Sequence, residues 1–102
     1  MRGLLISATA ADDTGTALVL TEHRSWPWIV LGLAGELDVD TAAQLRSRLW
    51  AILADAYAPQ LVIDLTELEF IDVAGLHELE QAQRLVEAVD GQLHLVCPQA
   101  RF

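Results

Sequence analysis

Two aspartates, Asp38 and Asp72, occupy equivalent places, because each follows an apolar run and precedes an amphipathic segment. Two carboxylates brought together are the residue types of a general acid and a general base. An aspartate just before a helix has a simpler use, since its side chain accepts hydrogen bonds from the first backbone N–H groups. We favour the interpretation that both aspartates cap helices. The alternative hypothesis is an enzyme in which the two form a catalytic pair.

No other motif supports catalysis. The sequence has no Ser-His-Asp arrangement and no glycine-rich nucleotide motif. His23, His77 and His94 fall on different elements without a short metal-binding spacing. We therefore expect a protein that is not an enzyme and has no cofactor and no metal.

The hydrophobic pattern predicts a single α/β domain with the order β-β-α-β-α-β. Strands are expected over residues 17–23, 28–34, 60–65 and 92–97, and helices over residues 41–57 and 72–90. Two strand–helix–strand units with right-handed crossovers give a mixed sheet of about four to five strands, with both helices on the same face. The apolar residues of the other sheet face must then be buried by another segment of the chain or by another subunit.

Local signals set the expected ends of the helices. Thr41 and Gln44 fit a capping box, with Asp40 as a rival cap, and Gly91 suits a left-handed C-terminal position. Thr66 begins an acidic turn after the third strand. The apolar stripe of the second helix is expected to be Leu76, Leu79, Ala82, Val86 and Val89.

Composition limits the class of partner. The chain has 102 residues, of which 53% are hydrophobic, and a net charge of −9, with arginine as the only basic residue type. Such a balance repels nucleic acid and anionic membranes and suits a basic protein surface. No run approaches the ~18 apolar residues of a membrane span. Cys97 is the single cysteine, and we expect it to be buried in a strand. Because no intramolecular disulfide is possible, we expect a protein of a reducing compartment, the cytoplasm.

Two motifs together carry a family resemblance. Gly35-Glu36-Leu37-Asp38 precedes the first helix, and Phe70-Ile71-Asp72-x-x-Gly-Leu precedes the second. With them, residues 17–102 resemble a STAS domain of the anti-sigma-factor antagonist type, preceded by an N-terminal extension over residues 1–16. The resemblance implies an α/β STAS-like fold and a protein that binds a kinase-type anti-sigma factor. The partner-binding residues that it implies are Asp38, Asp72, Val73, Ala74, Gly75, Leu76 and His77.

The chain departs from that family in two ways. Ala74 stands where relatives carry a phosphorylatable serine or threonine, so we expect no phosphorylation there, and Thr66 is a weak substitute. The last helix of the family is expected to be absent, with residues 99–102 resembling its approach. The alternative function is a STAS accessory subunit of a transporter or a signalling scaffold. An uncovered sheet face with Trp26 and Trp28 nearby predicts a homodimer or a stable hetero-complex.

Overall fold

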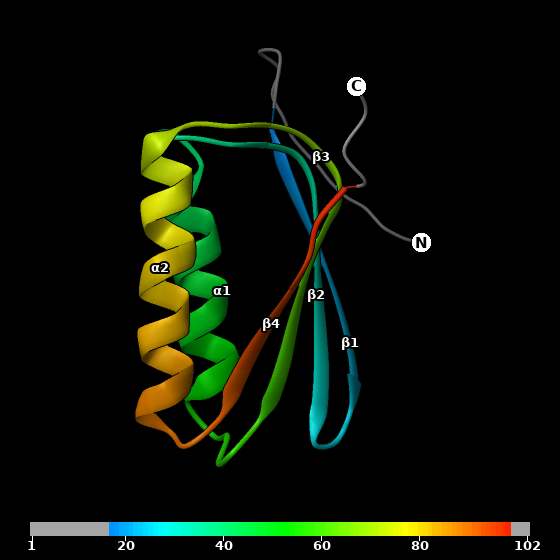
Figure 1. The fold of residues 1–102 in the computed structure, drawn as a ribbon, viewed down its shortest axis with the longest axis vertical. Coiled ribbons are helices and arrows are strands. Elements are labelled where there is room, and N and C mark those ends of the chain that lie inside the picture. The colour runs from blue at the N-terminus through cyan, green and yellow to red at the C-terminus, as the bar shows by residue number, and fades with distance from the viewer. Residues whose placement is uncertain (1–16, 99–102) are drawn as a thin grey trace.

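The computed structural model describes residues 17–98 as a mixed sheet with two helices on one face (Figure 1). The elements are β1 (Leu18–Ser25), β2 (Trp28–Leu37), α1 (Ala42–Leu53), β3 (Gln60–Ile71), α2 (Val73–Ala88) and β4 (Gln92–Val96). This order confirms the predicted fold class. The predicted extension over residues 1–16 and the approach to a further helix over residues 99–102 lie outside the described residues. Neither described helix is long and apolar enough to cross a membrane.

The sheet places the ends of two central strands side by side. Its strand order is β1-β2-β3-β4, with β1 antiparallel to β2 and with β2, β3 and β4 parallel. Leu37 at the end of β2 pairs with Ile71 at the end of β3. The chain therefore leaves the sheet toward α1 and toward α2 from adjacent positions, at the same end of the molecule (Figure 1).

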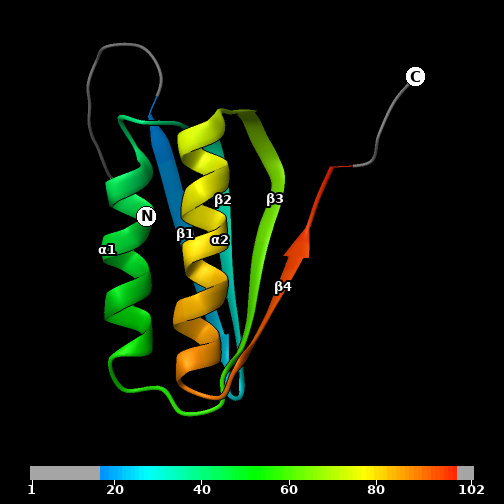
Figure 2. The same ribbon diagram turned by 60° about the vertical axis from the view of Figure 1, so that its left-hand side comes forward.

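The core lies between the sheet and the helices. In the first halves of β2 and β3 every second residue is buried, as in Ile29, Leu31 and Leu33, and these side chains meet apolar side chains of α1 and α2. Burial of each such side chain contributes about 1.5–3 kcal/mol. Figure 2 shows α1 and α2 side by side over this face. The fully or nearly buried members are Leu18, Ile29, Leu31, Leu33, Leu37, Leu45, Leu49, Ile52, Leu53, Leu61, Ile63, Leu65, Leu79, Ala82 and Val86.

One partly buried ion pair joins the two helices. Glu78 of α2 is only 4% exposed, and its carboxylate accepts two hydrogen bonds from the Arg46 guanidinium of α1, at 2.8 and 3.2 Å. The hydrogen bond and the charge of Glu78 raise the pKa of Arg46 above its usual value. A buried carboxylate without such a partner would be costly, so this pair fixes the position of α1 relative to α2.

The predicted turn after the third strand is wrong. β3 continues through Thr66 and Glu67 to Ile71, and β2 continues to Leu37. The added residues pair with each other, with register shifts between Gly32 and Ala34 and between Gly35 and Glu36. The prediction ended the strand where the continuous apolar run stops at Leu65, and it assigned the acidic residues that follow to a turn.

The end of α2 also differs from the prediction. Asp90, with φ of 61°, takes the left-handed position expected for Gly91, and the N–H of Gly91 donates to the carbonyl of Val86 at 2.9 Å, as in a Schellman motif. Gly91 is needed for another reason, because a Cβ there would lie 2.5 Å from the carbonyl oxygen of Pro59. Cys97 lies just beyond β4 and is exposed, so its predicted burial is wrong.

Candidate functional site

Asp72 connects the two junctions where β2 and β3 leave the sheet. Its Oδ1 accepts a hydrogen bond from the backbone N–H of Gly75 at 2.9 Å, which caps α2. Its Oδ2 accepts from the backbone N–H of Val39 at 3.3 Å, in the loop between β2 and α1. The predicted helix cap is thus confirmed for Asp72. The same carboxylate also holds the neighbouring loop, which the sequence did not indicate.

Asp38 organises that loop from within. Its Oδ1 accepts from the backbone N–H groups of Asp40 at 2.9 Å and Thr41 at 3.1 Å. Thr41 is the residue before α1, but its side chain makes no capping bond; its hydroxyl donates to the carbonyl of Glu36 at 2.8 Å. The predicted capping box is therefore wrong, because the Thr41 hydroxyl is bonded to Glu36 and the backbone N–H of Gln44 donates to the Thr41 carbonyl at 2.9 Å.

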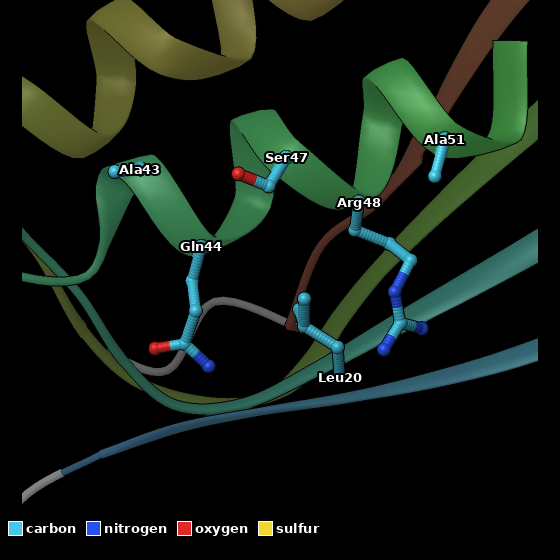
Figure 3. A pocket seen from close by; sticks show the side chains of 6 residues that line it. All are labelled: Leu20, Ala43, Gln44, Ser47, Arg48 and Ala51. Carbon is cyan, nitrogen blue, oxygen red and sulfur yellow. The ribbon is translucent and has the colours of Figure 1, made fainter. Parts of the chain in front are cut away.

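Gln44, the other member of that predicted box, lies on a different surface. Its Nε2 donates to the carbonyl of Leu18 on β1 at 2.9 Å. Arg48 reaches Glu22 of the same strand at 3.4 Å. Figure 3 shows both side chains crossing the shallow groove between α1 and β1, so they hold the helix against the edge strand. The residues lining this groove are Leu20, Ala43, Gln44, Ser47, Arg48 and Ala51.

Gly75 is required by a close approach of the backbone. A Cβ at this position would lie 2.4 Å from the carbonyl oxygen of Leu37 and 2.8 Å from Cγ1 of Ile71. The first turn of α2 thus packs directly on the end of β2, as the sequence reading of a close approach expected. Only glycine permits that contact without moving the strand or the helix.

Apolar side chains project from these anchored segments into solvent. Val73 is 80% exposed, Val39 71%, Leu76 53% and Phe70 49%. Val73 and Leu76 are neighbours on α2, being three residues apart, and Val39 is held beside Asp72. We call Val39, Phe70, Val73, Ala74, Leu76 and His77 the junction surface. A soluble monomer rarely groups exposed apolar side chains in this way without a partner.

The sequence predicted most members of this surface but not all. Leu76 was also expected in the core stripe of α2, and its exposure shows that assignment to be wrong. His77 is exposed, with its Nδ1 3.7 Å from Glu80. Val39 was missed, although an apolar residue between two aspartates in a predicted loop was a usable signal.

None of the six side chains of the junction surface carries a hydroxyl group, and the Thr41 hydroxyl in the neighbouring loop belongs to a residue that is only 8% exposed. Ala74, in the first turn of α2, is half-buried. Thr66 lies in β3, six residues before Asp72, which is roughly 20 Å along a strand. Hydrogen bonds from its backbone N–H and its side chain hold the pKa of Asp64 below its usual value. Thr66 is thus part of the sheet and is not brought to the junction surface.

The remaining candidate residues do not gather into a catalytic or metal site. His94 lies on β4, with its Nε2 2.9 Å from Oε1 of Gln60 and its ring 5.6 Å from that of Trp28. His23 is exposed on β1 and His77 on α2. Within residues 17–98, no group of three histidine, cysteine or carboxylate side chains has the arrangement of a metal site. Asp72 caps α2 as predicted, whereas Asp38 binds backbone N–H groups of the loop before α1, so its predicted role as a helix cap is wrong.

A family model and curated proteins of similar sequence identify relatives of a single type. A family model described as the STAS domain matches residues 17–102. The chain is 37% identical over 71 residues to the anti-sigma-F factor antagonist RsfB of Mycobacterium tuberculosis, covering 70% of this chain and 48% of RsfB. It thus spans about half the length of that curated relative. Such antagonists are binding regulators rather than enzymes.

Solved structures with a similar fold include proteins of the same type. The crystal structure of an anti-sigma factor antagonist from Mycobacterium paratuberculosis is 28% identical, with a TM-score of 0.69 over 79% of this chain and 68% of that one. The Bacillus cell fate determinant SpoIIAA in its phosphorylated form is 26% identical, with a TM-score of 0.65 over 81% and 74%. The chain therefore belongs to the STAS domain family.

Proposed function

We propose that this STAS domain is a protein-binding regulator that docks its junction surface on a kinase-type anti-sigma factor. The observation that carries the proposal is the group of exposed apolar side chains, Val39, Val73 and Leu76, on segments that Asp72 joins. Because the segments are anchored, their ordering costs little on binding. The names of the relatives give the class of partner.

Each residue of the site has a defined role in this proposal. Val73, Ala74 and Leu76 form the apolar centre of the contact, with Val39 beside them and His77 at the border. Asp38, Asp72 and Gly75 position these side chains by holding the loop and the first turn of α2 together. The apolar side chains and His77 contact the partner directly, whereas Asp38, Asp72 and Gly75 act only by positioning them.

We further propose that binding is constitutive. Val73 and Ala74 at the start of α2 carry no hydroxyl that a kinase could modify. A phosphate at this helix N-terminus would add about 1.5 to 2 negative charges to an otherwise apolar contact. Alanine resembles an unmodified serine in size and lack of charge, so the docked state needs no dephosphorylation.

A binding measurement with a matched control tests the proposal. The probe is the anti-sigma-F factor of Mycobacterium tuberculosis, measured by calorimetry against the purified chain and against Ala74→Glu and Ala88→Glu. Both variants add one negative charge to α2, but Ala88 is exposed in the last turn. A charge at position 74 must be desolvated on docking, so we expect Ala74→Glu to weaken binding at least tenfold and Ala88→Glu to leave it unchanged.

Other outcomes would reject the proposal. If the wild-type chain does not bind, or if both variants bind equally well, the junction surface is not the docking site for this class of partner. The alternative function, an accessory subunit of a transporter or signalling scaffold, would then become the better hypothesis.

A further inference from the structure

The junction surface is bordered by carboxylates. Val39 lies between Asp38 and Asp40 in the loop. Phe70 follows Glu69 on β3 and pairs with Glu36 of β2. Asp40 and Glu69 are exposed, and within residues 17–98 neither side chain has a hydrogen-bonding or ion-pair partner, so both charges are available to a bound protein.

Carboxylates continue along α2. Glu80 lies one turn beyond Leu76, with 71% of its side chain exposed. Its position, four residues from Leu76, places it on the same side of the helix. Exposed acidic residues therefore adjoin the junction surface along the chain in three places, in the loop after β2, near the end of β3 and on α2.

The arginines of the described residues do not offset the charges of Asp40 and Glu69. Glu22 binds both Arg24 and Arg48, and Glu78 binds Arg46. Arg84 lies four residues beyond Glu80 on α2, close enough to offset part of the charge of Glu80. It is eight residues beyond Leu76, about 12 Å along the helix axis, which exceeds the screening length of about 8 Å at physiological salt.

We propose, resting on the function proposed above, that the partner presents arginine or lysine side chains around an apolar pocket. The pocket receives Val73 and Leu76, and the cations face Asp40, Glu69 and Glu80. Complementary charges at the border of an interface act mainly on the association rate, because they attract the partner before contact. The centre and the border thus differ: a charge in the centre weakens docking, whereas the border charges accelerate it.

The same charges argue against other occupants. A nucleic acid or an anionic membrane would bring phosphates toward carboxylates, which repel them. A second copy of this chain docked by the same surface would place Asp40, Glu69 and Glu80 against identical groups. Like charges set opposite one another across an interface disfavour binding.

Stopped-flow binding to the anti-sigma-F factor of Mycobacterium tuberculosis tests the inference with Asp40→Asn, Glu69→Gln and the double variant. Asp55→Asn is the control, since Asp55 is exposed and lies two residues after α1, whose C-terminal end is at the opposite end of the molecule from the start of α2 (Figure 1). We expect each border variant to slow association by roughly 2- to 5-fold and the double variant by about tenfold. Asp55→Asn should have no effect.

Salt provides the second measurement. Raising the salt from about 0.1 M to about 1 M shortens the screening length from about 10 Å to about 3 Å. The wild-type association rate should fall across this range, and that of the double variant should change less. Binding that is unaffected by salt and by both border variants would overturn the cationic partner surface while leaving the docking site intact. Absence of any binding would instead reject the proposed function.

Discussion

At the scale of single residues, the proposed site depends on the missing hydroxyl group at Ala74 and on the two hydrogen bonds that Asp72 accepts. The methyl group of Ala74 lies in the first turn of α2, where free backbone N–H groups would stabilise a phosphate. The sequence alone was sufficient to predict that Asp72 caps this helix and that Gly75 allows a close approach. It did not indicate the bond from Val39 to Asp72, because the two residues are 33 positions apart and only the pairing of β2 with β3 brings them together.

The first prediction is that the wild-type chain accepts no phosphate and that Ala74→Ser does. Incubation with ATP and a kinase-type anti-sigma factor that binds the chain, followed by intact mass and peptide mapping, measures this. The wild-type mass should not change, whereas Ala74→Ser should gain one phosphoryl group within residues 70–77. Thr66→Val is the control for a displaced site. Phosphate on Thr66 of the wild-type chain would show that the switch has moved and has not been lost.

The second prediction separates the two bonds of Asp72. Asp72→Asn keeps one acceptor oxygen, which can still cap Gly75, but its amide nitrogen cannot accept from Val39. Asp72→Ala removes both bonds and should cost about 1 kcal/mol of unfolding free energy, as for a lost helix cap. Urea denaturation and backbone amide exchange measure the two effects. We expect Asp72→Asn to accelerate exchange at Val39 more than at Gly75; equal protection at both amides in this variant would contradict a bond between the loops.

At the scale of elements, the sequence predicted which segments form and misplaced their ends. The strands and helices were correct because their apolar periodicity reflects the burial of one helix face and alternate strand residues. β3 extended beyond prediction because backbone pairing with β2 continues past the apolar run, through acidic residues that the prediction assigned to a turn. Asp90 takes the left-handed position, and residue 91 is a glycine for a different reason, because a Cβ there would meet the carbonyl oxygen of Pro59. Contacts between elements, which a local pattern does not contain, set each of these ends.

The third prediction concerns the link between α1 and α2. Arg46→Leu should lower the unfolding free energy, because it leaves the carboxylate of Glu78, which is 4% exposed, without its partner. The loss should be smaller than for a fully buried pair, since the Arg46 side chain is 52% exposed. The double variant Arg46→Leu with Glu78→Leu should recover most of the loss, because it removes the unpaired charge. Chemical denaturation of the single and double variants measures this. A double variant less stable than Arg46→Leu would mean that Glu78 has other stabilising contacts.

At the scale of the whole molecule, both helices cover one face of the sheet, as the crossover rule predicted, and the described elements leave the other face open (Figure 1). That face carries Trp28, Val30 and Val62, with Val19 and Val96 toward its edges; Trp28 is 47% exposed and Val19 56%. Val30 and Val62 are paired across β2 and β3 at its centre. Asp64 lies on the same face, paired with Gly32 and Val96, so the apolar part of the open face is centred on Trp28, Val30 and Val62.

The last prediction is that the chain self-associates through this open face. Sedimentation at micromolar concentration should show a species of twice 11.2 kDa, and Val62→Arg should dissociate it, because a charge at the centre of a closed interface must be desolvated. Val62→Arg also lowers the magnitude of the net charge from −9 by one, to −8, which by itself would favour association. Dissociation of the variant would therefore come from the interface and not from general repulsion.

Arg84→Ala, on α2, is the control for a change of charge elsewhere. A wild-type chain that sediments as a folded 11.2 kDa monomer would exclude the dimer and leave the open face to other segments of the chain or to a different protein.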